Sequence, residues 1–440
     1  MKVFQVLNHF LPQQTAGTEV YTWALSKQLQ QKNIEVEVVI PHYGKKEPAT
    51  YVYDELPVFQ YAEPSDVDRS LIMGFRKPDG LKEFTAHLQK EQPDLVHFHE
   101  LAGSNGITLQ HIIAAKSLGA KVIMTFHLAG YTCKTGNLLY KDEELCDGLI
   151  RLQKCSSCYL HGKGNAAMNT FLLPVSTLLN QSGIDTTKWN SKLGTALGTV
   201  HLIEQLKKNF ETLVQHCDRV VTITQWYKQV LLLNGVQENK ISYIPQGLPL
   251  ETSDQLSNQT QRISTAIRFI FIGRINQFKG LHLLLEAISD IPAHLIALDI
   301  YGQTGDEVYE NEWRNKTQGH GNIQWKGRLQ QQEVVKTMQQ YDALCLCSTF
   351  SEMSPLVIQE AFSAGIPVVA SNVYGNAEQI RHDVNGLLFR FKDVASLKEQ
   401  LQRCIDEPVL LHSLKKNITP PRSFKEVADA YEQLYKEVLR

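Results

Sequence analysis

The feature that most constrains the fold of this chain is an alternation of strand and helix patterns that occurs in two runs. The first run ends near residue 245 and the second begins near residue 266. The stretch between them is polar and contains Gly, Pro, Ser and Asn, which is typical of a linker. Strands that alternate with helices form mostly parallel sheets covered on both faces. The sequence therefore predicts two doubly wound α/β domains.

Short apolar runs indicate the strands and amphipathic runs indicate the helices. In the first run the predicted strands are 3–7, 34–40, 94–99, 121–126, 219–223 and 240–244, and the predicted helices are 18–32, 107–118, 199–217 and 225–233. In the second run the predicted strands are 268–272, 295–300, 343–346 and 367–370, and the predicted helices are 280–288, 331–340 and 355–364. Thr18 can cap the first helix, and Gly17 lets the backbone approach a ligand. The stretch between the strand 121–126 and the helix 199–217 is expected to be irregular.

The composition excludes several classes of protein. The chain has 440 residues, 43% of them hydrophobic and 20% charged, which is ordinary for a soluble globular protein of two domains. The 44 basic and 46 acidic side chains leave no positive field that would attract nucleic acid. No secretory signal and no bilayer-spanning apolar stretch is evident. We expect a cytoplasmic protein, and peripheral contact with the inner face of the membrane stays open.

Two basic residues follow the first strand of the second run. No phosphate loop G-x-x-x-x-G-K-[ST] is present, and no G-x-G-x-x-G follows the first strand of either run, so kinase, GTPase and ordinary dehydrogenase functions lose support. Instead the strand ends at Gly273-Arg274, and Lys279-Gly280 open the next helix. A guanidinium and an ammonium at the carboxyl end of a strand suit a diphosphate. Two solvated surface cations are the alternative.

Two glutamates follow the strand 343–346. Glu352 lies in the loop after this strand, and Glu360 lies about two turns along a helix that Pro355 can open. Carboxylates accept hydrogen bonds from the vicinal hydroxyls of a sugar or ribose, and the backbone N–H groups of a helix start can hold phosphate. We expect both carboxylates to line one ligand, although Glu360 alone would be assigned to a solvated helix face.

The eight cysteines are unevenly spaced. Cys133, Cys146, Cys155 and Cys158 fall within 26 residues and end in a C-x-x-C pattern, whereas the other four are scattered. Four thiolates in a long loop can form a tetrahedral structural zinc site. An iron–sulfur cluster and a set of reduced thiols are the competing interpretations.

The motifs of both runs resemble the retaining glycosyltransferases of family GT4, which have the GT-B fold. The residues that carry the resemblance are Gly273-Arg274, Lys279-Gly280, Glu352, Glu360, Gly365-Ile366-Pro367-Val368-Val369, Gly375-Asn376-Ala377-Glu378, Gly17, His127 and Ile244-Pro245-Gln246-Gly247. The four-cysteine spacing also resembles a cluster found in a subset of this family. The similarity runs from the first strand to the last helix.

The resemblance implies the domain organisation. Residues 1–245 would form a Rossmann-like acceptor-binding domain with a cysteine-rich insertion at about 130–200. Residues 246–265 would be the linker, and residues 266–420 a Rossmann-like domain that binds a nucleotide sugar. Residues 421–440 would form a helix that crosses back to the first domain. The two domains would face each other across a cleft.

The resemblance also implies roles for the donor site. Arg274 and Lys279 would neutralise the diphosphate leaving group, so no catalytic metal is expected. Glu360 would hold the ribose hydroxyls and Glu352 the donor sugar. The other donor-binding residues would be Gly17, Gly273, Arg328, Met353, Ser354, Pro355, Leu356 and Val357.

His127 would stand near the anomeric carbon and act by positioning donor or acceptor. Many relatives have an acidic residue after this histidine, where the chain has Leu128, which weakens any proposal that a neighbouring carboxylate orients the ring. Other departures from the family are Ala16 in place of a glycine and Gln246 in place of an asparagine. His97 and His99 are interpreted as structural, with His99 the better candidate for the cleft.

We therefore expect a metal-independent retaining glycosyltransferase. Its partners would be a nucleoside diphosphate sugar and a hydroxyl acceptor, whether a polysaccharide, a glycolipid or a small molecule. A sugar-nucleotide epimerase of the same fold is one alternative, but such enzymes lack glutamates paired at this spacing. A catalytically silent sugar-nucleotide-binding or scaffold protein is the other alternative.

Overall fold

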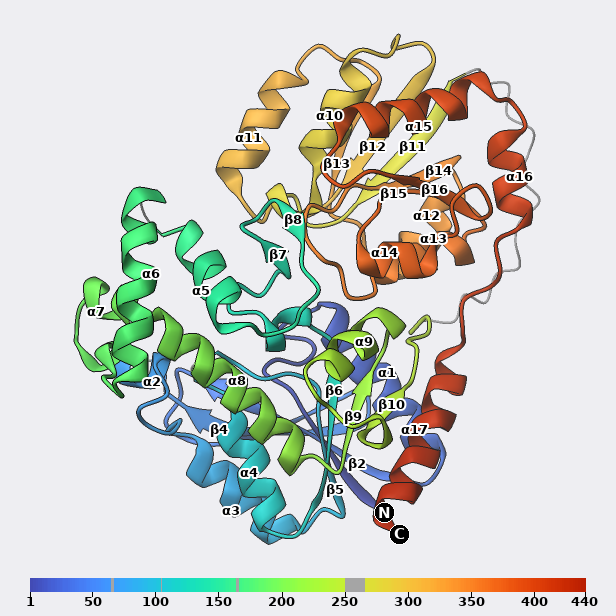
Figure 1. Ribbon diagram of the computed structural model, residues 1–440. Helices are drawn as coiled ribbons and strands as arrows, with labels where there is room; N and C mark the ends of the chain where they lie inside the picture. Colours follow the sequence, from blue (N-terminus) through green and yellow to red (C-terminus); the bar gives the residue numbers. More distant parts are fainter. Residues whose placement is uncertain (65–66, 104, 164–165, 250–265) are drawn as a thin grey trace. The chain divides into compact units, whose positions relative to one another are not determined.

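The described residues of the computed structural model are 1–64, 67–103, 105–163, 166–249 and 266–440 (Figure 1). The chain divides into two compact units: unit 1 comprises Met1–Pro245 and Phe424–Arg440, and unit 2 comprises Gln246–Ser423. Most of the predicted linker, residues 250–265, lies outside the described residues. Residues 246–249 are packed rather than free, because Leu248 N–H donates to the Arg422 carbonyl (2.9 Å) within unit 2.

Unit 1 is built on an eight-stranded sheet in the order β10-β9-β6-β5-β1-β2-β4-β3. The strands are β1 (Lys2–Val6), β2 (Glu35–Tyr43), β3 (Ala49–Tyr53), β4 (Leu56–Glu63), β5 (Leu95–Phe98), β6 (Lys121–Phe126), β9 (Arg219–Thr222) and β10 (Ile241–Tyr243). All neighbours are parallel except β3, which runs antiparallel to β4 at the edge. The strand order reverses between β1 and β5. Open sheets of this kind bind ligands at such a point, outside the carboxyl ends of the strands.

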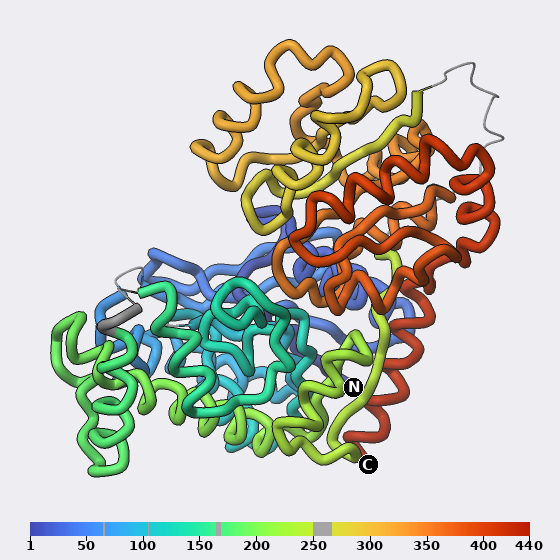
Figure 2. Tube along the Cα trace, turned by 45° about the horizontal axis from the view of Figure 1, so that its top comes forward, coloured from blue at the N-terminus to red at the C-terminus, as the bar shows by residue number. Residues whose placement is uncertain are grey.

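Helices that cover this sheet include the last helix of the chain. They are α1 (Gly17–Gln31), α2 (Arg69–Ile72), α3 (Leu81–Glu91), α4 (Leu109–Ser117), α8 (Thr199–His216), α9 (Gln225–Leu233) and α17 (Phe424–Leu439). α17 buries residues at helical spacing, among them Val427, Tyr431 and Tyr435, in the same core cluster as α1. Figure 2 shows this helix ending close to the N-terminus. A segment distant in sequence therefore completes the core of unit 1.

The first helix begins differently from the prediction. Its N-cap is Ala16, in an extended conformation and without a side-chain hydrogen bond. Thr18, predicted as the cap, lies within the first turn, where its carbonyl accepts the Thr22 hydroxyl (2.8 Å). Gly17 is the first residue of the helix and is exposed.

The region predicted to be irregular between β6 and α8 contains helices. It comprises β7 (Leu139–Tyr140), β8 (Glu144–Leu145), α5 (Leu152–His161), α6 (Ala166–Gln181) and α7 (Lys192–Leu197). Pro174 lies inside α6, and the helix continues through it. A proline removes only one backbone donor, and the remaining hydrogen bonds of the helix can maintain it at a cost of about 3 kcal/mol. No helix among the described residues is long and apolar enough to span a bilayer.

Unit 2 is built on six parallel strands in the order β13-β12-β11-β14-β15-β16. The strands are β11 (Ile267–Ile272), β12 (Ile296–Tyr301), β13 (Ile323–Gly327), β14 (Ala343–Leu346), β15 (Val368–Ser371) and β16 (Gly386–Phe389). The helices are α10 (Leu281–Ser289), α11 (Glu307–Lys316), α12 (Val334–Met338), α13 (Leu356–Ser363), α14 (Tyr374–Gln379), α15 (Val394–Asp406) and α16 (Leu410–Lys416). The strand order reverses between β11 and β14. The prediction of two parallel-sheet α/β domains is confirmed.

Candidate functional site

The loop after β11 carries both predicted basic residues. Gly280 closes this loop in the left-handed conformation, with φ of 66°, and a Cβ at this position would lie 1.8 Å from the Cys347 carbonyl oxygen. Only glycine therefore fits at this position, both for its backbone angle and for its contact with the residue that follows β14. The close approach brings Lys279 next to the loop after β14.

Lys279 and Glu352 form an ion pair in unit 2. Lys279 Nζ lies 2.6 Å from Glu352 Oε1, and the Ser348 hydroxyl donates to the same oxygen at 2.6 Å. Glu352 is 6% exposed, so it is a carboxylate that has lost most of its water and is compensated by a cation and a hydroxyl. Its second oxygen, Oε2, forms no hydrogen bond with the described residues. This oxygen is available as an acceptor for a ligand hydroxyl.

Arg274 follows Gly273 at the carboxyl end of β11 and is exposed. Its stem packs against Gly305, where a Cβ would lie 2.6 Å from Arg274 Cγ. Within the described part of the chain, its guanidinium makes no ion pair. The structure thus holds the stem of Arg274 and leaves its charge uncompensated, which suits a residue that binds an anion.

The backbone of the loop after β14 is held by Gly375 and Asn376. Gly375 N–H donates to the Glu352 carbonyl (3.1 Å), and a Cβ on Gly375 would lie 2.4 Å from the carbonyl oxygens of Glu352 and Met353. Asn376 is buried and donates to the Ser371 carbonyl (3.0 Å). The motif Gly375-Asn376 therefore positions the Glu352 loop through the backbone.

Glu360 lies on α13 and has a different partner from Glu352. It is 7% exposed, and Gln331 donates to its Oε1 through Nε2. Burial raises the pKa of Glu360 to about 7, because a charged carboxylate is poorly solvated there. Glu360 is therefore not the solvated residue that its sequence position alone would suggest. No local sequence signal points to Gln331, which lies 29 residues before its partner.

The remaining predicted donor residues follow the carboxyl ends of the strands in unit 2. Pro355 is the N-cap of α13, and Leu356 and Val357 are its first residues. The Ser354 carbonyl accepts a hydrogen bond from Gln246 Nε2, and Met353 is buried. Arg328 follows β13 and is exposed. Gly17, the other predicted donor residue, belongs to unit 1.

Three histidines lie at the carboxyl ends of β5 and β6 in unit 1. His97 lies within β5, His99 follows this strand, and His127 follows β6. His97 and His99 are fully buried, whereas His127 is 9% exposed. His127 Nε2 lies 3.0 Å from His99 Nδ1, and His99 Nε2 lies 2.7 Å from Gln5 Oε1. Gln5 and His99 are therefore partners of His127 that sequence reasoning missed.

All three rings are neutral at physiological pH. Burial lowers the pKa of His127 to about 3 and holds the pKa values of His97 and His99 well below the ordinary 6.5. A neutral imidazole has one donor nitrogen and one acceptor nitrogen. This restricts how the three rings can be connected.

The contacts fix the direction of each hydrogen bond. Gln5 Oε1 can only accept, so His99 carries its proton on Nε2 and accepts on Nδ1. His127 then carries its proton on Nε2 and donates to His99. The His127 Nδ1 atom is left as the acceptor of the ring, and no described residue hydrogen-bonds to it.

The last helix extends this network. Tyr435 OH lies 2.7 Å from His97 Nδ1 and accepts from Gln5 Nε2 at 3.4 Å, and His97 Nε2 lies 2.7 Å from Thr125 Oγ1. α17 thus helps to orient Gln5. We name Gln5, His97, His99 and His127 the histidine network.

Two acidic residues near the same end of the unit 1 sheet were also missed. Glu19, in the first turn of α1, is 2% exposed, and its Oε2 has no hydrogen-bond partner among the residues that the structure describes. Glu100 follows His99 and accepts from Asn8 N–H (2.8 Å). Burial raises the pKa of both carboxyls. Their position directly after β5 and at a helix start is the signal that could have identified them.

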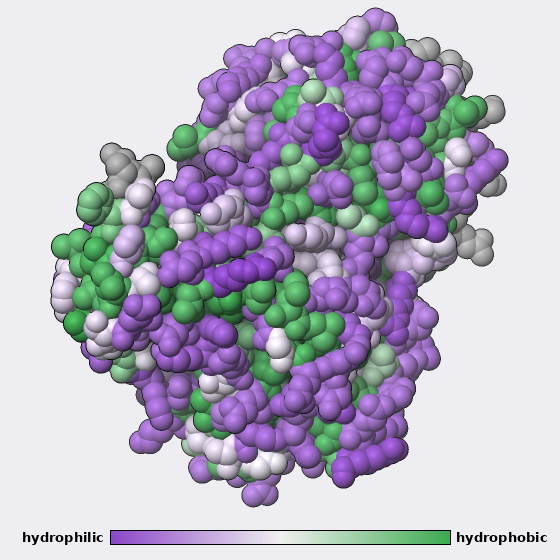
Figure 3. All heavy atoms as spheres, in the orientation of Figure 1, coloured by the Kyte–Doolittle hydropathy of each residue, from purple (hydrophilic) through white to green (hydrophobic). Residues whose placement is uncertain are grey.

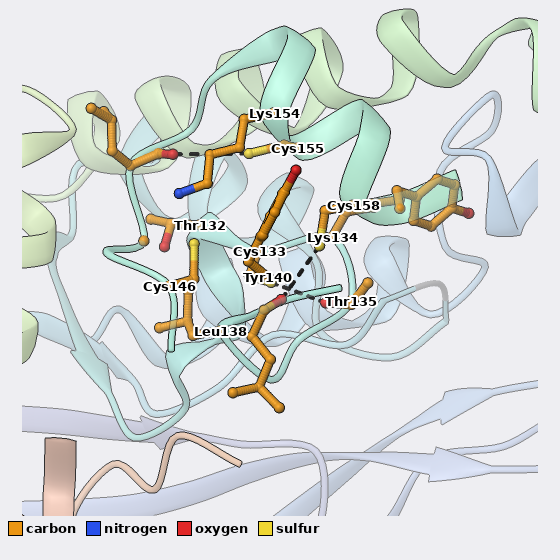
Figure 4. Close-up of a pocket in the computed structure, with 14 residues that line it drawn as sticks. Thr132, Cys133, Lys134, Thr135, Leu138, Tyr140, Cys146, Lys154, Cys155 and Cys158 are labelled. Atoms are coloured by element: carbon orange, nitrogen blue, oxygen red, sulfur yellow. Dashed lines mark hydrogen bonds between the residues drawn. The ribbon is translucent and has the colours of Figure 1, made fainter. Parts of the chain in front are cut away.

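The four clustered cysteines line one small cavity. Figure 4 shows Cys133, Cys146, Cys155 and Cys158 around it, and the cavity has a volume of about 20 Å³, close to the space that one water molecule needs. Cys155 and Cys158 lie on α5 rather than in an irregular loop. All four are free thiols. In the described ranges no three His, Cys, Asp or Glu side chains are placed to share a metal ion.

Two family models match the chain. Residues 252–419 match the model described as glycosyl transferases group 1, and residues 15–146 match the model described as glycosyltransferase family 4.

Characterised relatives are similar over part of their length. The lipopolysaccharide 1,6-galactosyltransferase of Escherichia coli K12 is 29% identical over 234 residues, which cover 50% of this chain and 61% of that protein. The UDP-Gal:alpha-D-GlcNAc-diphosphoundecaprenol alpha-1,3-galactosyltransferase of Escherichia coli is 28% identical over 185 residues, which cover 40% of this chain and 48% of that protein. The alignments therefore span about half to three fifths of these relatives.

Solved structures are similar over nearly the whole chain. Sucrose-phosphate synthase from Thermosynechococcus elongatus superposes with a TM-score of 0.66 at 16% identity, covering 99% of this chain and 98% of that one. HepE of Anabaena, in complex with UDP and glucose, superposes with a TM-score of 0.60 at 13% identity, covering 99% and 100%. At this identity the likeness establishes the fold. The chain thus has the two-domain GT-B fold, with a region similar to glycosyltransferase family 4 followed by a region similar to glycosyl transferases group 1.

Proposed function

We propose that this chain is a retaining glycosyltransferase that moves a sugar from a nucleoside diphosphate sugar to an acceptor hydroxyl. The observation that carries the proposal is the set of charges at the carboxyl ends of β11 and β14, namely an uncompensated Arg274 and the Lys279–Glu352 pair. The names of the relatives support it, since two are galactosyltransferases and one is named for a UDP-linked sugar. A neighbour in fold was solved with UDP and glucose.

The donor would be held by unit 2. Arg274 and Lys279 would bind the diphosphate, because two cations stabilise the charge that develops on the leaving group in place of a metal ion. Glu352 would accept a donor-sugar hydroxyl at Oε2, the oxygen that Lys279 and Ser348 leave unused. Glu360 would accept the ribose hydroxyls. The N–H groups at the start of α13 would face the phosphates.

Transfer would proceed without a protein nucleophile. The bond between the anomeric carbon and the phosphate oxygen breaks, and a bond from the acceptor oxygen to the same carbon forms on the same face. The acceptor proton passes to an oxygen of the departing diphosphate. The anomeric configuration of the sugar is therefore retained.

His127 would act on the acceptor side, in unit 1. The histidine network gives its ring a fixed tautomer, with Nδ1 as the free acceptor for a substrate hydroxyl. The proposed orienting partner is therefore His99, held by Gln5, rather than the carboxylate that Leu128 replaces. Gln5 and His99 are positioning residues, because they act through His127.

Two alternatives predict different behaviour. A catalytically silent protein would bind a nucleotide sugar without turnover, and an epimerase would change the sugar without consuming an acceptor. A thermal-shift panel of uridine, guanosine and adenosine diphosphate sugars identifies the donor first, because a bound ligand stabilises the folded state. Product analysis with the best donor then separates the three functions.

Glu352→Gln tests the site. The substitution removes the charge that pairs with Lys279 and should reduce transfer by about 10²-fold or more. Glu312→Gln is the matched control, since Glu312 is a half-exposed residue of the same unit whose partner, Lys316, is exposed. Unchanged turnover in the Glu352→Gln variant would refute the proposed site.

A structural zinc ion held by Cys133, Cys146, Cys155 and Cys158 is a separate proposal. The residues fit it in chemistry, because four thiols line one cavity and Cys158 Sγ accepts the Lys141 N–H at 3.2 Å. In the structure the four thiols are too far apart to bind one ion together, so zinc would have to draw them together.

Elemental analysis after anaerobic purification tests this proposal. One zinc per chain supports it, iron with visible absorbance indicates a cluster, and neither metal refutes both.

A further inference from the structure

A group of large apolar side chains is exposed on α6, on α7 and on the segment that joins these two helices. The side chains are Phe171 (80% exposed), Leu178 (64%), Leu193 (60%), Trp189 (49%), Ile184 (47%) and Val175 (41%). We name them the apolar surface. Figure 3 shows a concentration of hydrophobic residues over these helices. Monomeric proteins rarely expose contiguous apolar area of this kind without a partner.

α6 is apolar on its outer side as well as on its inner side. Phe171, Val175 and Leu178 lie at spacings of four and three residues, on one face, and point outward. Leu172, Leu173 and Leu179 are partly buried. The outer face therefore adds apolar surface that the packing of the helix does not use. α6 also contains no Asp, Glu, Lys or Arg between Ala166 and Gln181.

Basic residues outnumber acidic ones around the apolar surface. The stretch 147–204 contains five basic residues, Arg151, Lys154, Lys163, Lys188 and Lys192, and three acidic residues, Asp147, Asp185 and Glu204. Asp147 pairs with Arg151 and Lys154, whereas Lys163 and Lys192 form no ion pair among the described residues. Asp185 is mostly buried, 16% exposed at the side chain, and lies within 4 Å of Lys188 and His201. The chain as a whole carries a formal charge of -2. The positive charge beside the apolar surface is thus local.

We propose that the apolar surface binds the interface of an anionic lipid bilayer. A helix with an apolar outer face inserts that face at the boundary of headgroups and acyl chains, and flanking lysines are attracted to anionic headgroups. Trp189 suits such a position, because an indole has an apolar body and a polar N–H. α6 is 16 residues long and would lie in the plane of the interface. This inference goes beyond the proposed transfer reaction and does not depend on it.

Vesicle sedimentation with the full chain tests the proposal. Vesicles of phosphatidylcholine alone are compared with vesicles that also contain phosphatidylglycerol. We expect binding to the anionic vesicles, and a loss of about tenfold or more when Phe171 and Leu178 are both replaced by Glu. The control is Val308→Glu, on α11 of unit 2, because Val308 is also 80% exposed and its replacement should leave binding unchanged.

Further measurements separate the possible occupants. Brominated lipids should quench the fluorescence of Trp189. The contribution of Trp189 is the part of the quenching that is lost in the Trp189→Phe variant. Replacing both Lys188 and Lys192 by Glu should abolish the preference for anionic vesicles.

Two results would overturn the proposal. One is wild-type protein that stays in solution with both kinds of vesicle, and the other is full binding by the variant that carries both Phe171→Glu and Leu178→Glu. A dimer in light scattering that this variant dissociates, without vesicle binding, would assign the surface to self-association instead.

Discussion

The two units place polar residues at equivalent points of similar sheets, but the groups differ in charge. In unit 1 the residues after β5 and β6 are neutral imidazoles joined by hydrogen bonds. In unit 2 the residues after β11 and β14 include Arg274, Lys279 and Glu352, with an ion pair of 2.6 Å. Pairing explains the difference, because His99 is buried with neutral partners, whereas Glu352, which is also buried, is paired with Lys279. The same topology can therefore orient a neutral acceptor or hold charges for an anion.

The largest expected effect is the loss of a cation from the charged site of unit 2. Lys279→Ala should lower kcat by about 10²–10³-fold, because this ammonium would stabilise the leaving diphosphate and also neutralises Glu352. Transfer kinetics with the donor found by thermal shift measure the effect. Lys316→Ala, on the exposed face of α11, is the control and should retain full activity. Equal activity of the two variants would show that the Lys279 ammonium does not contribute to transfer.

The next effect concerns the neutral site of unit 1. Gln5→Met removes the oxygen that accepts from His99 Nε2 and should release the tautomer of His127, with a loss of kcat of about ten- to hundredfold and little change in donor KM. Nitrogen-15 NMR of histidine-labelled protein reports which ring nitrogen carries the proton. In the wild-type chain His127 should show a protonated Nε2 and an unprotonated Nδ1.

Tyr431→Phe is the control for this experiment. It removes a hydroxyl that bonds to Thr125 at 2.9 Å but leaves the contacts of Gln5, His99 and His127 in place, so the tautomer should not change. A wild-type His127 protonated on Nδ1 would contradict the assigned bond directions, whatever the activity. The expected tautomer combined with full activity of His127→Gln would instead refute only the role of His127 in transfer.

The smallest effect is a difference in how the two units respond to pH. Glu360 has a folded pKa of about 7 against an ordinary 4.5, so unit 2 should lose stability as pH rises from 4.5 to about 7, by about 3 kcal/mol at most. His127 has a folded pKa of about 3 against an ordinary 6.5, so unit 1 should lose stability as pH falls below 6.5. Burial also raises the pKa of Glu63 in unit 1 to about 7, so the rise from pH 4.5 to 7 should destabilise both units. Hydrogen exchange read by mass spectrometry reports each unit separately.

Single substitutions sharpen this comparison. Glu360→Gln should reduce the loss in unit 2 at pH above 7, and His127→Gln should reduce the loss in unit 1 under acid. His320→Gln, an exposed histidine in unit 2, is the control and should alter neither profile. Profiles that neither Glu360→Gln nor His127→Gln changes would contradict the protonation states assigned to these two residues.

Local sequence patterns were enough to predict which charged residues follow the strands of unit 2. Gly273-Arg274, Lys279-Gly280 and Glu352 directly follow strands, and strand ends meet at one edge of a parallel sheet. The partners of these residues were not predictable in the same way. Lys279 and Glu352 are 73 residues apart, and Gln5 and His99 are 94 apart, so no local pattern links them. The helices α5, α6 and α7 were missed because their apolar residues include outward-facing ones and a proline.

The sequence by itself determined the central strands of both sheets, and with them the residues that follow those strands. Periodicity and glycine positions determine these features, and both act over a few residues. The tertiary structure alone decided the charge and direction of the groups at those positions. Burial made the histidines neutral, and Tyr435, from the last helix, helped to fix the orientation of Gln5. Desolvation and long-range hydrogen bonds depend on the packed fold, and a linear pattern does not contain them.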